Sequence, residues 1–556
     1  MLTVCVPAAV AIATVGVMHP FPVLCLAVQS TAPAMLLTLA GEIKQSYIAG
    51  YLKTKFPQFI GNFVSLIIFL LQNKSEGNMK NNSTPFVHFF KTHKANYIYD
   101  FNTNAILKVN SDVYDDIKQF VETGELNSTR PDSKEVISSI QRQGYLNSFR
   151  WKEILHPASK LLPYYLDNCM QMLTLQVTQA CNLRCAYCTY SGNFVNRHHS
   201  NVRMSYDTAK KAVDFYIKHS TNTDKLNFGF YGGEPLLEFE LIKNVIEYIE
   251  KNSEGKEKGY NLTTNATLLN EEIVSFLQEY DVRLTISIDG PKEIHDKNRI
   301  KKDCSGSFDT IIENIKMISE KFPSYGDKVM FNCVLDPRND FGCINEFFTN
   351  YEGINGFYSS FAHIAKEYII NDVYDTAEEY SKQYDYEVFK LIMSKIGRLD
   401  KKHVSKIVEA YYLNIKNAMI DNRPVTAGMA QIGHHGGPCI AGMHKLFVNA
   451  QGDFYPCEKV SECSEAMKIG SIDSGFNQDK IYQLINIGQL TENQCKGCWA
   501  AKFCYLCALF ADDSGNLSID RKMFYCKQVR ENVEQQLKEY CLLKEMNFDE
   551  EDVYIL

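Results

Sequence analysis

Regular alternation of hydrophobic and polar residues organises the centre of the chain. Leu173, Leu175 and Val177 alternate with polar residues, which predicts a strand that begins at Met172. Strand and helix patterns then alternate as far as residue 361. Strands are expected at 226–231, 260–265, 282–288, 329–335 and 356–361, and helices at 204–219, 271–280, 307–318 and 345–351. Six strand–helix units predict an α/β fold with a parallel, barrel-like sheet covered by helices.

A second pattern, in residues 85–145, predicts a small strand-and-helix unit. Alternating residues at 97–101 and 105–109 flank the turn Asn102-Thr103-Asn104, which is typical of a hairpin. We expect a further strand at 86–90, a helix capped by Ser111 and ended by Gly124, and a second helix at 133–142. A linker is expected from Gly144 to Asn168, before the sheet begins.

The first 78 residues carry the least information. Met1–Met18 is almost wholly apolar, but it lacks the basic start of a signal peptide and contains Pro7. The apolar run 59–71 is short for a membrane span. Composition changes abruptly at 74–83, so our hypothesis is that translation naturally starts near Met79 and that residues 1–78 are an extension. A membrane-tethering segment is the alternative.

The rest of the chain divides by its helical patterns and its cysteines. We expect the sheet domain at 170–365, and a helical bridge at 366–435 with helices at 375–397 and 401–421. A cysteine-rich domain is then expected at 436–530 and a tail at 531–556, after the breaker-rich run His434–Pro438.

Composition limits the partners and the compartment. In 556 residues the net charge is −8 and the pI is near 6.0, which gives no electrostatic footprint for nucleic acid. Eleven of the 18 cysteines fall within 181–188 and 439–526, with the spacing of metal ligands. This distribution favours bound metal in a reducing cytoplasm over a framework of disulfides, and a membrane location is not expected.

Cys181, Cys185 and Cys188 lie directly after the first strand of the sheet. One short loop can offer these three thiolates to a single iron–sulfur cluster, whose fourth iron then has no protein ligand. The alternative is a helical stripe of buried cysteines, but the strand pattern up to Thr178 opposes it. In this CxxxCxxC loop the chain resembles the radical SAM superfamily, which implies a partial (β/α)6 barrel, a [4Fe-4S] cluster and S-adenosyl-L-methionine.

The same resemblance implies roles for residues that end the next strands. Gly232-Gly233-Glu234-Pro235 would line the amino group of S-adenosylmethionine with backbone and carboxylate acceptors. Asn265 and Ser287 would lie near the ribose, and Arg299 would grip the methionine carboxylate in a bidentate manner. The alternative for each is a polar residue that satisfies the backbone of a loop.

The C-terminal cysteines resemble the SPASM extension. Cys439, Gly452 and Cys457 fit its first half, but two residues separate Cys504 from Cys507 where that pattern has three. The resemblance implies one auxiliary cluster on Cys495, Cys498, Cys504 and Cys526, and another on Cys439, Cys457 and Cys507. Cys463 or a substrate thiolate would fill the vacancy in the latter. A structural zinc ribbon is the alternative for these cysteines.

Together these features resemble peptide maturases of the sactipeptide and ranthipeptide group. That resemblance implies homolysis of S-adenosylmethionine to a 5′-deoxyadenosyl radical, and thioether crosslinks in a ribosomally made, cysteine-rich precursor peptide. Residues 85–145 resemble the winged-helix modules that bind a leader peptide by strand addition, although a domain that caps the barrel is an alternative. A flavodoxin- or ferredoxin-type protein would donate the electrons.

Other functions remain open at this stage. The anaerobic sulfatase-maturating enzymes form formylglycine and carry an aspartate after the equivalent of Cys457, where this chain has Glu458. Glu458 keeps the acidic group one methylene further from the backbone, and it is our candidate catalytic residue. The extra methylene matters because a base must reach its proton within hydrogen-bond distance. A peptide epimerase or carbon–carbon crosslinking enzyme is also possible. A nonenzymatic iron–sulfur electron carrier or zinc scaffold would show no cleavage of S-adenosylmethionine.

Overall fold

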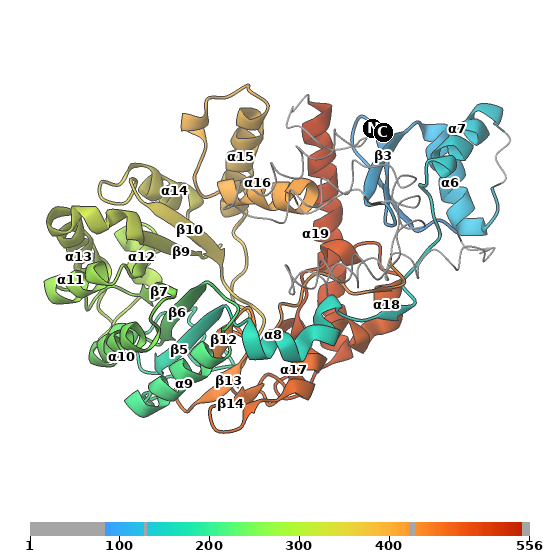
Figure 1. Cartoon of the computed structure of the whole chain (residues 1–556). Helices are drawn as coiled ribbons and strands as arrows, with labels where there is room; N and C mark the ends of the chain where they lie inside the picture. The colour runs from blue at the N-terminus through green and yellow to red at the C-terminus, as the bar shows by residue number, and fades with distance from the viewer. Residues whose placement is uncertain (1–83, 127–129, 422–425, 427–429, 547–556) are drawn as a thin grey trace, which may run out of the picture. The chain divides into compact units, whose positions relative to one another are not determined.

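A computed structural model describes residues 84–126, 130–421, 426 and 430–546 (Figure 1). These residues belong to one unit that spans residues 83–556. The expected extension 1–78, the expected start near Met79 and the end of the expected tail lie outside the described residues. Among the described helices, none combines the length and the apolar character needed to cross a bilayer.

The predicted parallel sheet is present and is not closed. Its order is β10-β9-β8-β7-β6-β5, with every neighbouring pair parallel. The strands are β5 (Met172–Thr178), β6 (Lys225–Gly232), β7 (Glu257–Thr264), β8 (Arg283–Ser287), β9 (Val329–Leu335) and β10 (Tyr358–His363). All six lie where the hydrophobic pattern predicted strands. Their carboxyl ends therefore meet along one edge of the sheet.

Helices cover the sheet (Figure 1). They are α9 (Tyr206–Lys218), α10 (Phe239–Asn252), α11 (Glu271–Glu279), α12 (Lys292–Asn298), α13 (Phe308–Lys321) and α14 (Phe341–Asn350). All of them except α12 bury apolar side chains. In α9 the Ser205 side chain accepts a hydrogen bond from the Thr208 N–H, as its position predicted, while Ala212 and Tyr216 face the core. Neither α10 nor α12 is among the predicted helices.

The same sheet continues into the C-terminal third of the chain. Strand β12 (Leu446–Val448) pairs in parallel with the outer edge of β5, with Phe447 opposite Thr174. Three further antiparallel strands follow: β13 (Asp453–Tyr455), β14 (Gly470–Ser471) and β15 (Gly475–Phe476). The edge of β5 is thereby covered, and the cysteine-rich segment is joined to the parallel sheet by main-chain hydrogen bonds.

The N-terminal unit has the elements that its pattern predicted. Strands β1 (Val87–Lys91), β2 (Asn96–Asp100) and β3 (Ala105–Val109) form an antiparallel sheet, followed by α6 (Ser111–Thr123) and α7 (Pro131–Arg142). The predicted cap is wrong by one residue, because the Asn110 side chain accepts from the Val113 N–H. Gly124 ends α6 in the left-handed conformation, as expected.

The segment expected to be a linker is in fact folded. It contains β4 (Glu153–Ile154), the 3-10 helix η1 (Pro157–Leu161) and α8 (Leu162–Asn168). Strand β4 pairs with β11 (Ile432–Gly433), almost 280 residues later in the chain. Long-range pairing of this kind leaves no local sequence pattern, and two-residue strands are too short to show alternation.

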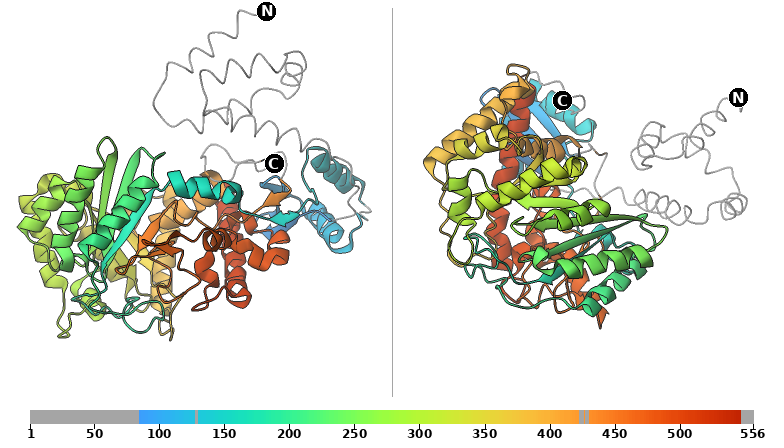
Figure 2. Two further views of the ribbon diagram at one scale, coloured as in Figure 1. Left: turned by 60° about the horizontal axis from the view of Figure 1, so that its bottom comes forward. Right: turned by 90° about the vertical axis from the view of Figure 1, so that its left-hand side faces the viewer.

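Helices of the second half connect the sheet to the N-terminal unit. They include α15 (Glu378–Lys395), α16 (Glu409–Lys416) with a π-turn (Asn417–Asp421), α17 (Gln478–Ile485), α18 (Glu492–Lys496) and α19 (Ile519–Glu545). The helix expected at 401–421 is broken, because only 401–403 and 409–421 are helical. The long α19 lies beside α16 and beside β1 (Figures 1 and 2).

Candidate functional site

The cysteine loop lies between β5 and α9, at the carboxyl edge of the sheet. Its sulfurs line a cavity of about 220 Å³ that also receives the ends of β6, β7 and β8. Every residue predicted to contact S-adenosylmethionine lines this cavity except Pro235, which begins a 3-10 helix (Pro235–Glu238) beside it. Residues expected from separate motifs are thus brought together: Cys181, Cys185, Cys188, Gly232, Gly233, Glu234, Asn265, Ser287 and Arg299.

Two glycines allow β6 to approach the cysteine loop. Gly232 has φ 154°, and a Cβ there would lie 2.2 Å from the Thr178 carbonyl oxygen. A Cβ on Gly233 would lie 2.3 Å from the Ala180 carbonyl oxygen. The backbone N–H of Gly233 donates to Thr178 and that of Glu234 donates to Ala180. The glycine pair is therefore required by close contact between two backbones.

The Glu234 carboxylate is buried, and other parts of the chain already engage it. It accepts hydrogen bonds from the Thr264 hydroxyl at 2.6 Å, the Asn265 N–H at 2.8 Å and the Leu236 N–H at 3.0 Å. Burial raises the pKa of Glu234, and these donors oppose the shift without cancelling it. Glu234 therefore holds the end of β7 in place, and a carboxylate with four lone-pair sites keeps capacity for one more donor.

Asn265 connects the end of β7 to the cysteine loop. Its Nδ2 donates to Asn182 Oδ1 at 2.8 Å and lies 3.9 Å from Cys181 Sγ, while its Oδ1 accepts from the Thr267 N–H and hydroxyl. The side chain is thus occupied by contacts within the protein. Ser287, the last residue of β8, is buried and also lines the cavity.

Arg299 is held by two residues that the sequence analysis did not single out. Its Nε donates to Asp289 Oδ2 at 2.9 Å in a buried ion pair, and the Tyr187 hydroxyl donates to the same oxygen. Asp289 Oδ1 accepts from the Val334 N–H. Because Nε makes this contact, the Nη groups of Arg299 are left for a carboxylate in the cavity. Asp289 could have been identified as a site residue from the sequence, because it lies just beyond the carboxyl end of β8.

The three thiols of the cysteine loop are set in a low-dielectric environment. Burial raises the pKa of Cys181 and of Cys185 to about 12, and it raises that of Cys188 as well. The Leu183 N–H donates to Cys181 Sγ and the Tyr190 N–H to Cys188 Sγ. Thiolates there require a cation in the cavity, and a metal centre supplies that charge. The donor set therefore fits an iron–sulfur cluster.

Two further groups of thiols lie in the C-terminal third. Burial, together with the sulfurs of Cys457 and Cys439, raises the pKa of Cys507 to about 12. Burial likewise raises that of Cys504 to about 12, with contributions from Cys498, Cys526 and Cys495. We call these the three-thiol set (Cys439, Cys457 and Cys507) and the four-thiol set (Cys495, Cys498, Cys504 and Cys526). The sequence analysis expects these same two sets to hold auxiliary clusters, and that assignment stays a prediction.

Cys463 does not join the three-thiol set through any described interaction. It is exposed, and the charges that act on its thiol are those of Glu462 and Arg197. Across residues 84–126, 130–421 and 430–546, no three His, Cys, Asp or Glu side chains are placed to hold one metal ion.

Glu458 lies beside both the three-thiol set and the cavity. Its carboxylate receives Lys445 Nζ at 2.9 and 3.1 Å, and its charge acts on Cys439, Cys457 and Tyr231. Tyr231 lines the cavity of the cysteine loop. Burial raises the pKa of Glu458, but the Lys445 ammonium and nearby donors outweigh burial, so the pKa lies below its ordinary value.

A buried arginine fixes the loop that carries Glu458. Arg197 donates to the Glu458 and Val460 carbonyls and pairs with the Glu462 carboxylate. Its guanidinium lies 5.8 Å from the Tyr231 ring centroid. The sequence analysis missed Arg197 and Glu462, which lie 265 positions apart. No local sequence motif around Glu462 indicates that its carboxylate is buried against Arg197.

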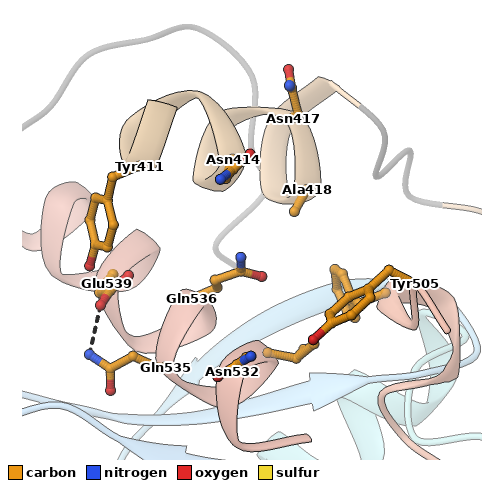
Figure 3. Close-up of a pocket in the computed structure, with 11 residues that line it drawn as sticks. Tyr411, Asn414, Asn417, Ala418, Tyr505, Asn532, Gln535, Gln536 and Glu539 are labelled. Atoms are coloured by element: carbon orange, nitrogen blue, oxygen red, sulfur yellow. Dashed lines mark hydrogen bonds between the residues drawn. The ribbon is translucent and has the colours of Figure 1, made fainter. Parts of the chain in front are cut away.

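A groove of about 600 Å³ lies apart from these thiols, between α16 and α19 (Figure 3). It is lined by aromatic side chains and by the amides of Asn414, Asn417, Asn532, Gln535 and Gln536. Gln535 donates to Glu539, the single carboxylate of the lining, and the lining includes no Lys, Arg or His. Phe503 and Tyr505 reach the groove from either side of Cys504. Amides that donate and accept suit a peptide backbone better than an anion.

Known proteins share parts of this architecture. Residues 175–348 match the model of the radical SAM superfamily. The chain is 26% identical over 376 residues to the cysteine-type anaerobic sulfatase-maturating enzyme of Clostridium perfringens, covering 65% of this chain and 95% of that relative. It is 24% identical over 307 residues to the radical SAM cyclopropyl synthase TigE of Paramaledivibacter caminithermalis, covering 51% of this chain and 61% of the synthase.

Among solved structures, the chain resembles native anSMEcpe with bound AdoMet and the Kp18Cys peptide. The TM-score is 0.50 at 19% sequence identity, and the match covers 68% of this chain and 99% of that one. Identity at this level shows a shared fold.

Proposed function

We propose that this chain, an enzyme of the radical SAM superfamily that uses S-adenosylmethionine, installs thioether crosslinks in a ribosomally made, cysteine-rich peptide. The observation that carries the proposal is the closeness of two features. Glu458 interacts with the three-thiol set and with Tyr231, which lines the cavity of the cysteine loop. A peptide bound at the cavity would therefore lie near the three-thiol set.

In the first site, the protein holds the reactants and excludes water. When bound, the cluster and S-adenosylmethionine supply a 5′-deoxyadenosyl radical that removes a hydrogen atom from carbon. Arg299 would hold the methionine carboxylate, and the backbone of Gly232 and Gly233 would hold the amino group. Tyr190 and Tyr231 close the cavity with aromatic surface, which keeps water from the reacting carbon.

In the second site, three thiols leave one position for a thiolate from the peptide. Because Cys463 is not grouped with these thiols, a substrate cysteine is the better candidate for the vacancy. Glu458 would accept the proton of that cysteine, and Lys445 keeps the Glu458 carboxylate ionised until then. Thioether formation removes one hydrogen atom from the carbon and one proton from the thiol, and the metal centre that the three-thiol set would hold would take up the remaining electron.

The N-terminal unit and the groove would hold the remainder of the peptide. Strand β3 ends the order β1-β2-β3 within the described residues, and a leader strand would add beside it at Lys108 and Val109, which are less buried than the rest of β3. Phe503, which lines the groove, packs 5.4 Å from Tyr99 of this unit. An extended peptide leaving the unit would meet the groove amides next.

The test is reconstitution without oxygen, followed by assay for 5′-deoxyadenosine and for peptide modification. We expect co-expression with a short cysteine-rich peptide from the neighbouring reading frame to remove two hydrogen atoms and to block one thiol for each bridge that forms. A peptide that keeps its mass and all of its thiols would overturn the crosslinking assignment.

Formylglycine formation is the second candidate, because of the similarity that covers 95% of a sulfatase-maturating relative. It would remove the sulfur of the target cysteine, so mass spectrometry separates the two reactions. The match to that relative covers only 65% of this chain. The residues outside the match could form a leader-binding unit. This difference favours the peptide maturase.

Glu458→Gln distinguishes proton transfer from mere placement. We expect crosslinking to fall roughly 10²- to 10⁴-fold, the usual contribution of a positioned base, while 5′-deoxyadenosine is still released. Both products are measured by mass spectrometry in the same reaction. Glu465→Gln, at an exposed carboxylate seven residues away, is the matched control and should retain full crosslinking. Equal loss of both products in Glu458→Gln would contradict a role as base.

A further inference from the structure

A lysine is buried against the four-thiol set. Lys522 lies in the first turn of α19 and is 1% exposed, four residues before Cys526 on the same helix. Its Nζ donates to the Ile487 carbonyl at 2.8 Å and to the Thr491 hydroxyl at 2.8 Å. The same atom lies 3.9 Å from Cys495 Sγ, and the Thr491 hydroxyl lies 3.3 Å from that sulfur.

The ammonium of Lys522 has no carboxylate partner among the described residues. None of the ion pairs there includes it, although surface lysines of α19 such as Lys527 and Lys538 are paired with glutamates. Histidines nearby do not supply a negative charge either, since His434 and His435 are neutral or positive. A buried ammonium without a counter-charge is costly, and neutral oxygens compensate it only in part.

The sulfurs of the four-thiol set are the groups that can supply this counter-charge. Burial raises the pKa of Cys526, and the Lys522 ammonium opposes that shift. Arg530 acts on Cys526 and Cys498 in the same direction. Four thiolates around a metal centre carry excess negative charge, so the buried lysine and an anionic centre stabilise each other.

We infer that Lys522 is a positioning residue whose fixed charge makes the metal centre of the four-thiol set easier to reduce. This rests on the proposed function and on the iron–sulfur cluster that the resemblance to the SPASM extension implies for the four-thiol set. One electron from a reductant adds one negative charge to the centre and moves no proton. A positive charge at this distance stabilises the reduced state more than the oxidised state, so it raises the reduction potential.

The experiment is a redox titration with dithionite, followed by electron paramagnetic resonance, of oxygen-free reconstituted protein. A Cys185→Ala background removes the signal of the first site. We expect Lys522→Met to shift one midpoint to lower potential, Lys522→Arg to stay near the parent value, and the other midpoint to stay unchanged. Lys527→Met is the matched control, because it removes a charge from the exposed face of the same helix.

Each outcome decides the inference. The inference is overturned if Lys522→Met retains its iron and its midpoint potentials are unchanged. It is also overturned if Lys527→Met shows the same shift in midpoint potential. If Lys522→Met loses iron, the midpoint potentials of Lys522→Gln and Lys522→Arg are compared instead. A lower midpoint in Lys522→Gln alone supports a role for the charge, and equal midpoints in the two variants overturn the inference. Zinc at this set, found by metal analysis, overturns the cluster and this inference together. If Lys522→Met shows the shifted midpoint but the parent enzyme forms no crosslinks in the peptide, only the proposed reaction is overturned.

Discussion

Replacing Cys185 by alanine is expected to abolish 5′-deoxyadenosine formation. The cysteine loop offers three sulfurs to one cavity, and a cluster held by only two of them lacks one of its protein ligands. Loss of a residue outside the ligand set of a metal typically costs about 10- to 100-fold, and loss of a ligand costs more. The measurement is 5′-deoxyadenosine per enzyme after reconstitution, alongside the iron content.

Two controls accompany this prediction. Cys304→Ala removes an exposed thiol outside all three thiol groups and should leave both iron content and turnover unchanged. Cys181→Ala and Cys188→Ala should match Cys185→Ala, because the three sulfurs serve one centre. If all three variants still cleave S-adenosylmethionine, the cysteine loop is not the reaction centre.

Asp289→Ala is expected to give the largest loss of stability. It leaves the Arg299 guanidinium buried without its carboxylate, and breaking such a pair typically costs about 3–5 kcal/mol. The hydroxyl of Tyr187 and the Val334 N–H lose their acceptor in the same change. Arg299 is also released from its position at the cavity, so binding of S-adenosylmethionine should weaken. Urea denaturation and calorimetric binding measure the two effects.

The matched control is Asp309→Ala, which removes an exposed carboxylate paired with Lys292 on the surface. Surface pairs contribute about 0–1 kcal/mol, so its stability should be close to that of the parent. Asp289→Asn keeps the shape and one acceptor oxygen but removes the charge, and its stability should fall between those of the other two variants. Unchanged stability and unchanged binding in Asp289→Ala would show that the buried pair serves neither fold nor site.

Features that depend on neighbouring residues could be read from the sequence. The six parallel strands follow from alternation within five to eight residues, and α9 follows from Ser205 and the apolar stripe after it. The cysteine loop and the Gly232–Gly233 pair are compact motifs, so each can be recognised from neighbouring residues alone. The cap of α6 was missed by one residue because Asn110 and Ser111 are both good caps, and only backbone geometry chooses between them.

Features that depend on distant residues required the tertiary structure. The pairing of β12 with β5 joins segments more than 270 residues apart, and no periodicity within either strand records it. Asp289 with Arg299, Arg197 with Glu462, and Lys522 with Cys495 are ordinary charged or polar residues in sequence. They become part of a site only because folding buries them together and removes the water that would otherwise solvate them. The sequence thus determined the six parallel strands and the spacing of the thiols, and burial decided which charges act on those thiols.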